Sequence, residues 1–221
     1  MRASTWKGDT AFAPLAAAGV LVTATVAAAA VVTGTPGDDL LRGTEQADRI
    51  SAFGGNDLVY ARGGADDVRA GAGNDGVRAA DGGDLVYGGR GDDVVAGGDG
   101  NDRLYGGSDS DQILGGNGND RGAGNKGSDV VAGGDGNDSL YGGWGPDRVF
   151  GASGNDGLHA LAPDGDPDLL NCGPGNDKAW VLRSERPHTQ LVGCETVFVV
   201  DGPSADQDEG ENADADSEAD A

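Results

Sequence analysis

An aspartate recurs at every ninth residue through the middle of this chain. The series has fourteen members and no gap: Asp39, Asp48, Asp57, Asp66, Asp75, Asp84, Asp93, Asp102, Asp111, Asp120, Asp129, Asp138, Asp147 and Asp156. A disordered chain has no physical reason to keep such a register. The chain must therefore fold into a structure whose unit is nine residues long.

A glycine-rich motif surrounds most of these aspartates. GGRGDDVVA begins at Gly88, GGDGNDRLY at Gly97 and GGDGNDSLY at Gly133, and the shared form is G-G-x-G-x-D-x-U-x with U aliphatic. The aliphatic residue follows each aspartate by two positions, and only Gly122 interrupts that series. Glycine permits positive φ and close backbone approach. The pattern predicts turns that alternate with short strands, each strand sending one aliphatic side chain into a thin core.

The segment from Gly34 to His159 resembles the repeats-in-toxin (RTX, haemolysin-type) calcium-binding nonapeptide repeats. The resemblance implies an all-β fold, a right-handed parallel β-roll or β-solenoid, in which two nonapeptides make one turn of the roll. It also implies that G-G-x-G-x-D forms the bend and x-U-x a short strand, with calcium ions between successive turns along both edges.

Composition independently favours a cation as the ligand. The 221 residues include 38 acidic and 15 basic side chains, for a net charge of −23. Such a charge excludes a nucleic-acid binder held by phosphate contacts and argues against docking on anionic membranes. Carboxylates beside uncovered backbone carbonyls are the oxygen ligands that calcium takes. The fourteen aspartates are therefore the candidate metal ligands.

Alternate aspartates are expected on opposite edges of the roll. Each edge then carries seven carboxylates with six gaps between turns, which gives at most about 12 interior calcium sites. Twelve such ions would carry a charge of about +24, close to the −23 of the chain, so folding and calcium binding should be coupled. Residues 34–87 are degenerate, with Phe53 and Arg62 at second-glycine positions, and Asp109 replaces a later glycine. We therefore expect the best occupancy between Gly88 and Asp156.

The two ends of the chain have different compositions. Residues 1–30 have the pattern of a secretory signal peptide, with Arg2 and Lys7 before an apolar run and small residues at Ala27–Ala30. Cleavage would leave an extracellular, secreted protein without a membrane segment; an uncleaved membrane span is the alternative. Residues 201–221 hold nine acidic residues and no Lys or Arg, which predicts a disordered acidic tail.

Residues 160–200 depart from the nine-residue register after an insertion around Pro163. We expect degenerate repeats and a small C-terminal β cap over the open end of the roll. Cys172 and Cys194 are the only cysteines. In an exported protein they predict a disulfide, with free buried thiols as the alternative.

The outward strand positions suggest possible partners. Tyr87 and Tyr105 should stack on one face, and such an aromatic ladder either binds glycan or covers the sheet. The other face carries an apolar stripe that includes Leu40, Leu58 and Val94, suited to self-association or to cover by the C-terminal segment.

Motifs of catalysis are missing from the sequence. His159 and His188 are the only histidines, and no H-E-x-x-H, G-x-S-x-G or phosphate-loop motif occurs. The sequence therefore predicts an exported, non-enzymatic calcium-binding repeat protein. A calcium-supported adhesin, or a glycan-binding protein of the extracellular matrix, is the alternative, and an enzyme with its site in residues 160–200 stays open.

Overall fold

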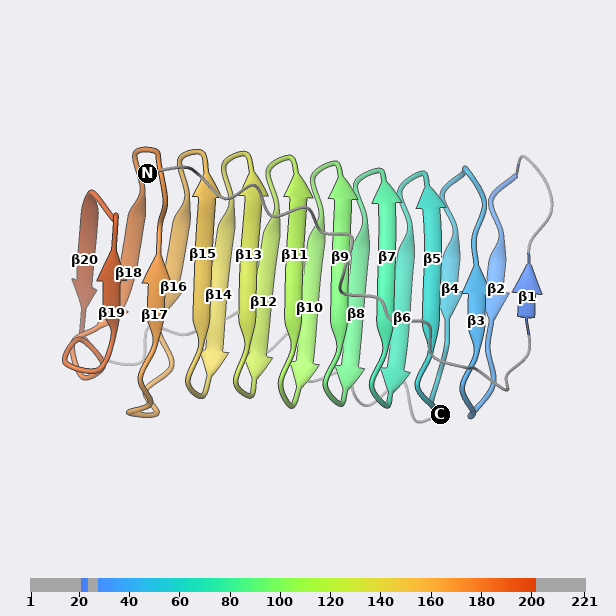
Figure 1. Ribbon diagram of the computed structural model, residues 1–221, viewed down its shortest axis with the longest axis horizontal. Helices are drawn as coiled ribbons and strands as arrows, with labels where there is room; N and C mark the ends of the chain where they lie inside the picture. Colours follow the sequence, from blue (N-terminus) through green and yellow to red (C-terminus); the bar gives the residue numbers. More distant parts are fainter. Residues whose placement is uncertain (1–20, 24–27, 202–221) are drawn as a thin grey trace, which may run out of the picture.

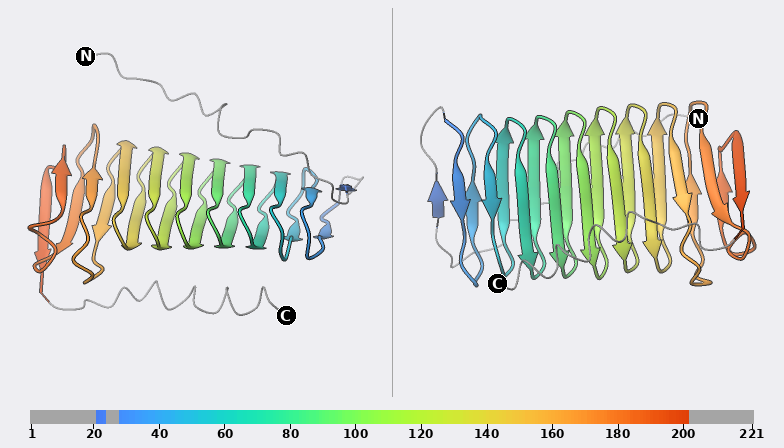
Figure 2. Two further views of the ribbon diagram at one scale, coloured as in Figure 1. Left: turned by 60° about the horizontal axis from the view of Figure 1, so that its bottom comes forward. Right: turned by 180° about the vertical axis from the view of Figure 1, so that it is seen from behind.

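The protein is a two-layered parallel β-solenoid, as the sequence predicts. The computed structural model describes residues 21–23 and 28–201, and this part of the chain contains strands and turns but no helix. Twenty strands form two parallel sheets of ten, the odd-numbered strands in one and the even-numbered strands in the other (Figure 1). Figure 2 shows the two sheets as facing layers, with the chain passing from one to the other at every turn.

The strand bounds follow the nine-residue period. The first sheet contains β1 (Leu21–Thr23), β3 (Leu40–Arg42), β5 (Leu58–Gly63), β7 (Gly76–Asp81), β9 (Val94–Asp99), β11 (Gln112–Asn117), β13 (Val130–Asp135), β15 (Arg148–Ser153), β17 (Leu169–Asn171) and β19 (Gln190–Val192). The second contains β2 (Val31–Thr33), β4 (Arg49–Ser51), β6 (Asp67–Ala72), β8 (Leu85–Arg90), β10 (Arg103–Ser108), β12 (Arg121–Lys126), β14 (Ser139–Trp144), β16 (Gly157–Ala160), β18 (Lys178–Leu182) and β20 (Thr196–Val200).

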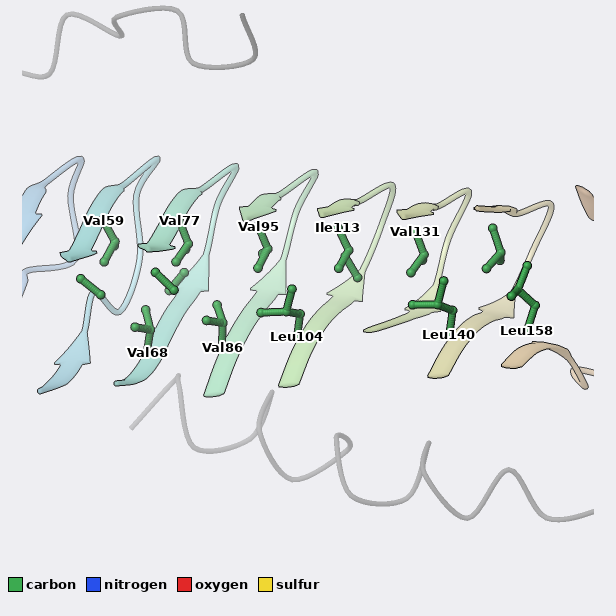
Figure 3. Close-up of a cluster of buried hydrophobic side chains, with 14 of the residues drawn as sticks. Val59, Val68, Val77, Val86, Val95, Leu104, Ile113, Val131, Leu140 and Leu158 are labelled. Atoms are coloured by element: carbon green, nitrogen blue, oxygen red, sulfur yellow. The ribbon is translucent and has the colours of Figure 1, made fainter. Parts of the chain in front are cut away.

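Through the regular part of the roll, each strand pairs with the strand eighteen residues later in the chain. Leu104 of β10 lies opposite Val86 of β8, for example, and Tyr105 opposite Tyr87. The aliphatic residues point inward from both sheets and form one continuous core between the layers (Figure 3). Their side chains are fully buried, so burial of this apolar column is a main source of stability.

Strands β5 to β15 are longer than the resemblance implies. Each has six residues instead of three, because the second and third positions of the following motif also pair with the adjacent turns. In β10, Gly107 and Ser108 still pair with Gly89 and Arg90. The bend shrinks to three residues, such as Gly91–Asp93, and most of the motif is sheet.

The single break in the aliphatic column, Gly122, is closed by its neighbours. A Cβ placed on Gly122 would lie 2.9 Å from Val131 Cγ1 and 3.3 Å from Leu140 Cδ2. The side chains around it therefore occupy the space that the missing aliphatic group leaves, and the core continues past this point.

Aromatic rings form a ladder on the outer face of the second sheet. The predicted Tyr87–Tyr105 stack is confirmed, with ring centroids 5.0 Å apart. A second stack, which the sequence did not reveal, runs through Tyr141, His159, Trp180 and Phe198 with centroids 4.2, 4.5 and 5.2 Å apart. Ala123 of β12 separates the two stacks.

Residues 160–200 continue the roll and do not form a separate layer over its end. Strands β17 and β19 extend the first sheet, and β18 and β20 extend the second. The irregular strands of this segment therefore stack on the roll as its C-terminal end. The last turn keeps Val192, Val197 and Phe198 exposed. The insertion around Pro163 is absorbed in the bend between β16 and β17, so the sheets keep their register.

The predicted signal peptide and acidic tail lie mostly outside the described residues. Within residues 1–30, β1 pairs with β3, and residues 28–30 lead into β2. Asp201, the first residue of the tail segment, forms an ion pair with Arg183. No helix in the described ranges is long and apolar enough to cross a membrane.

Candidate calcium sites

The fourteen aspartates stand in two columns, one at each edge of the roll. From Asp39 to Asp138, the backbone N–H of each aspartate donates a hydrogen bond to Oδ1 of the aspartate eighteen residues later. Asp93 donates to Asp111 at 2.8 Å, and Asp120 donates to Asp138 at 2.8 Å. The predicted alternation between edges is therefore confirmed as geometry. All fourteen side chains are buried, each with at most 4% of its surface exposed.

The second carboxylate oxygen of most column members lacks a hydrogen-bond partner. Among the described residues, a buried Oδ2 atom without a partner occurs at Asp57, Asp66, Asp75, Asp84, Asp93, Asp102, Asp111, Asp120, Asp129, Asp138, Asp147, Asp156 and Asp177. A buried ionised oxygen is costly unless it is paired or binds a metal. This orphaned row of oxygens is therefore suited to cations.

Backbone carbonyls converge with these oxygens at the first glycine of the motif. A Cβ built on Gly88 would lie 2.5 Å from Asp93 Oδ2 and 2.6 Å from the carbonyl oxygen of Gly106 in the next turn. At Gly115 the corresponding distances to Asp120 Oδ2 and the Gly133 carbonyl oxygen are both 2.4 Å. The missing side chain thus lets a carboxylate and a carbonyl face the same small space, which fits a hard cation.

Four turns in the N-terminal half have a methyl group at this place. Ala52, Ala61, Ala70 and Ala79 occupy the first motif position, and all four are fully buried in the core. This methyl makes the core of the turn more apolar and fills the space that glycine leaves open. The sequence distinguished the two halves of the roll by their irregular second and fourth positions; alanine at the first position further distinguishes the four turns that begin at residues 52, 61, 70 and 79.

In the first two turns, threonines donate hydrogen bonds to the aspartates. Thr35 donates to Asp39 Oδ2 through both its backbone N–H and its hydroxyl. Thr44 does the same for Asp48, with its N–H bound to Oδ2 and its hydroxyl 3.0 Å from Oδ1. Both oxygens of Asp48 are therefore satisfied, which lowers the need for a cation there, whereas Oδ1 of Asp39 stays buried without a hydrogen-bond partner in the described chain.

The second and fourth motif positions require positive φ. Gly116 and Gly118 have φ of 121° and 137°. The substitutions that the sequence singled out do adopt this conformation, with φ of 76° at Phe53, 88° at Arg62 and 80° at Asp109. Left-handed backbone costs a non-glycine residue free energy, so these turns are strained. Ala80, Asn125 and Ala152 share the strain and were not identified from the sequence.

Burial raises the pKa of the column carboxyls between Asp57 and Asp156 above the ordinary value of 3.8. Desolvation is the largest cause, the hydrogen bond from the preceding aspartate's N–H opposes it, and neighbouring carboxylates raise the pKa further. The pKa of Asp93 rises to about 9, that of Asp75 to about 8 and that of Asp102 to about 7. Without a cation, these groups therefore favour their protonated form near neutral pH.

The columns continue beyond the fourteen predicted members. Asp168 accepts the N–H of Asp147 at 3.0 Å, and Asp177 accepts that of Asp156 at 2.8 Å. Asp177 in turn donates its N–H to Glu195 Oε2 at 2.8 Å. The nine-residue spacing between Asp168 and Asp177 was the available signal for two of them. Glu195 lies eighteen residues after Asp177 and so keeps the register, but it is a glutamate without a glycine-rich bend and was not identified from the sequence.

A second ladder runs beside each column at the fifth motif position. Asn119 donates its N–H to Asn101 Oδ1 at 2.7 Å, and Asn137 donates to Asn119 Oδ1 at 2.8 Å. In this second ladder, each N–H donates to the turn that precedes it in the chain, whereas the N–H of each aspartate donates to the turn that follows. The two ladders therefore fix adjacent turns in both directions, and the sequence reasoning missed the second one.

No group of three or more His, Cys, Asp or Glu side chains converges on one point in the part of the chain that the structure describes. A cation between two turns would therefore be held by one or two carboxylates together with backbone carbonyls. This is the kind of oxygen-rich, weakly charged donor set that calcium accepts and that zinc, with its nitrogen and sulfur ligands, does not prefer.

The family comparison agrees with this donor set. Four copies of the RTX calcium-binding nonapeptide repeat match the chain, at residues 33–68, 61–95, 87–122 and 123–158. The matches cover more than half of the 221 residues. The chain belongs to the RTX calcium-binding repeat family. No curated protein matches the sequence. The RTX match ends before β17, so the turns that contain Asp168, Asp177 and Glu195 extend the RTX roll beyond its recognised repeats.

Proposed function

We propose that this RTX protein is an exported, non-enzymatic calcium-binding protein that folds when calcium binds. The observation that carries the proposal is the row of buried Oδ2 atoms without hydrogen-bond partners among the described residues, each beside a backbone bend. Calcium bound between turns would supply positive charge to these oxygens and so allow the carboxylates to stay ionised inside the roll.

The preferred sites are the turns that have glycine at the first motif position between Gly88 and Asp156. There the aspartate Oδ2 and a carbonyl of the next turn face the same open space, as they do at Gly88 and Gly115. The alanine turns at residues 52–84 serve mainly as structural turns with weaker sites. In this proposal, only the turns that keep this space open bind calcium strongly. The number of bound ions is therefore smaller than the upper limit of about 12 that the sequence suggests.

Export is supported by the N-terminal sequence pattern and by the Cys172–Cys194 disulfide, whose Cα atoms lie 5.1 Å apart. Disulfides persist in oxidising compartments. The proposed location is extracellular, after removal of a signal peptide.

The glycan-binding alternative is less well supported. In the two aromatic stacks the ring planes are within 17° of parallel, and each ring face lies against its neighbour. A sugar ring needs an exposed aromatic face, whereas stacking leaves mainly ring edges toward solvent. The ladder is therefore better suited to holding adjacent strands together.

The direct test of the proposal is a calcium titration of the purified chain. We expect an expanded chain in chelator and a gain of β structure at millimolar calcium, followed by circular dichroism. Magnesium should replace calcium poorly because it demands a near-octahedral site. Equal β structure in chelator and in calcium would overturn the proposal.

Substituting one aspartate in the centre of the roll should weaken folding more than substituting one at its end. Asp120 has an orphaned Oδ2 and lies between two regular turns, whereas Thr44 already satisfies both oxygens of Asp48. Because the stability of a stacked array is a sum of turn and interface terms, a central loss interrupts propagation. Asp120→Ala should therefore raise the calcium concentration at the folding midpoint clearly more than Asp48→Ala. Equal midpoints at the same ionic strength would contradict this ranking.

A further inference from the structure

The last complete bend of the roll, residues 172–177, lies outside the matched repeats but has their main features. Asp177 is fully buried, accepts the N–H of Asp156, and keeps an Oδ2 without a hydrogen-bond partner within the described chain. The N–H of Asn176 donates to Asn155 Oδ1 at 2.9 Å, so the second ladder also reaches this bend. It differs from a regular bend at one place, where Cys172 replaces the first glycine. As in the alanine turns, a Cβ occupies this position, so a site here depends on an additional carboxylate.

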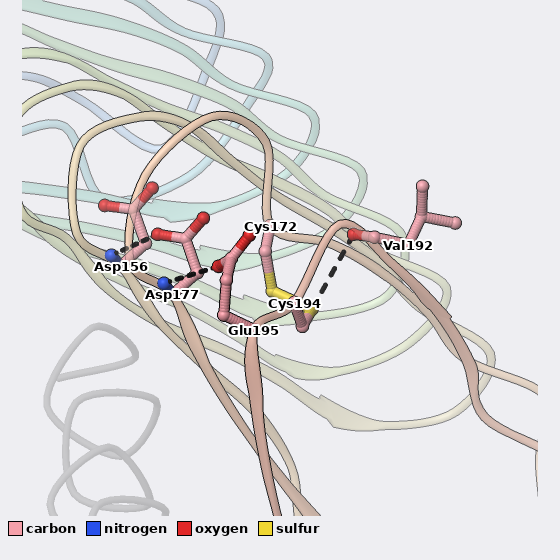
Figure 4. The surroundings of a disulfide bond; sticks show 6 residues. All are labelled: Asp156, Cys172, Asp177, Val192, Cys194 and Glu195. Carbon is pink, nitrogen blue, oxygen red and sulfur yellow. Dashed lines mark hydrogen bonds between the residues drawn. A yellow bond between two sulfur atoms is a disulfide. The ribbon is translucent and has the colours of Figure 1, made fainter.

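Glu195 takes the place of an aspartate in the turn that follows. Its Oε2 accepts the N–H of Asp177, and it is exposed, since the described sheet ends at β20. The longer side chain of glutamate reaches the column from a turn that lacks the glycine-rich bend. Figure 4 shows the carboxylates of Asp156, Asp177 and Glu195 in one row, beside the disulfide.

The disulfide joins the two turns that contribute these carboxylates. Cys172 starts the bend that ends at Asp177, and Cys194 directly precedes Glu195. Cys172 also donates its N–H to the carbonyl of Val192 at 2.9 Å. An end strand such as β20 pairs on one side only and tends to fray. The covalent link therefore limits how far Glu195 can move from Asp177.

We propose that Asp177 and Glu195 form a terminal calcium site outside the recognised repeats, and that the Cys172–Cys194 disulfide positions it. The inference rests on the proposed function, because it assumes that the buried columns bind calcium. Asp177 Oδ2 supplies the buried carboxylate oxygen and Glu195 the exposed one, so calcium can enter from solvent at this end of the folded roll. Opening the disulfide lowers the affinity of this site.

Trp180 provides a local probe of the site. It follows Asp177 by three residues, at the start of the chain's last turn, and stacks between His159 and Phe198. Terbium takes the same oxygen ligands as calcium and is excited through a nearby indole. In full-length protein in which Trp6 and Trp144 are changed to Phe, terbium luminescence excited through Trp180 reports binding at the turns next to Trp180.

The matched substitution is Glu195→Gln, which keeps an oxygen to accept the Asp177 N–H and removes the charge. We expect it to lower the terbium affinity at Trp180 by about tenfold, with calcium displacing terbium in the parent protein. Asp135→Asn removes an exposed carboxylate at the edge of β13 and should leave the signal unchanged.

Reduction tests the role of the disulfide. A dithiol reagent gives two electrons and two protons to the bond, yields two thiols and is itself oxidised to a disulfide. We expect reduction to weaken terbium binding at Trp180 by about tenfold, and Glu195→Gln to add little in the reduced protein. Full binding at Trp180 in the Glu195→Gln variant, or an equal effect of that substitution in both redox states, would overturn the proposal. If calcium fails to fold the chain at all, it is the general function that fails, so the two failures are distinguishable.

Discussion

Calcium-free protein is expected to lose its β structure as the pH rises from about 5 to about 9. Burial raises the pKa of the column carboxyls in the fold, to about 7 at Asp138, about 8 at Asp111 and about 9 at Asp93, from 3.8 in the unfolded chain. Folding without metal therefore takes up protons. The stability of the metal-free fold is fully present below the pKa that the carboxyls have in the unfolded chain. It is lost as the pH rises through the higher pKa values that they have in the fold.

Calcium removes this dependence, because a bound divalent cation favours the ionised carboxylate. Calcium-loaded protein should therefore keep its β structure over the same range, because the carboxylates are ionised both in the unfolded chain and in the calcium-bound fold. The measurement is far-UV circular dichroism and small-angle scattering of metal-free and calcium-loaded protein at one-unit steps of pH. Points near the sequence pI of about 4.1 are avoided because the chain there has no net charge to keep it soluble.

The neutral variant Asp129→Asn is the control for this experiment. Its amide oxygen can still accept the N–H of Asp111, as asparagine oxygens already do in the second ladder. It should stabilise the metal-free fold at pH 8 and weaken calcium binding. Two results would contradict the proposed role of the buried carboxyls. One is a metal-free chain that gains structure as the pH rises, and the other is an Asp129→Asn variant that is less stable both without and with calcium.

Gly115→Ala is expected to remove calcium binding locally while the roll still forms. Gly115 has an ordinary φ, so alanine is compatible with its backbone, and Ala52, Ala61, Ala70 and Ala79 already occupy the equivalent position. The new Cβ would lie 2.4 Å from both Asp120 Oδ2 and the Gly133 carbonyl oxygen, so one or both must move out of the shared space. We expect affinity at the adjoining sites to fall on the order of 10-fold to 100-fold, as is usual for changes beside metal ligands.

The neighbouring Gly116→Ala is the contrasting variant. Gly116 has φ of 121°, and a Cβ there would lie 2.1 Å from the carbonyl oxygen of Gly98, so backbone pairing itself must change. We expect it to lower the folded fraction even at saturating calcium, whereas Gly115→Ala should reach the full signal at higher calcium. Isothermal titration and circular dichroism separate the two results. Unchanged calcium stoichiometry and affinity in Gly115→Ala would show that the first position does not shape the site.

The sequence by itself determined the architecture of the roll. The nine-residue spacing from Asp39 to Asp156 fixes which side chains share a column, because a stacked turn places residues eighteen apart next to each other. Alternation along a strand then sends residues such as Val86 and Leu104 inward and Tyr87 and Tyr105 outward. These are local consequences of periodicity, so they could be predicted without any knowledge of distant contacts.

Only the tertiary structure decided which turns have the geometry of a cation site. Whether a carboxylate oxygen stays without a hydrogen-bond partner depends on which groups reach it. Thr44 donates to the carboxylate of Asp48, whereas Asp120 Oδ2 has no such donor in the described chain. The role of the first glycine appears only when the carbonyl of the next turn, such as that of Gly133, is seen to face the same space. Glu195 keeps the eighteen-residue spacing to Asp177, but only the pairing of β18 with β20 and the Cys172–Cys194 link show that it joins the column, because no glycine-rich bend marks it in the sequence.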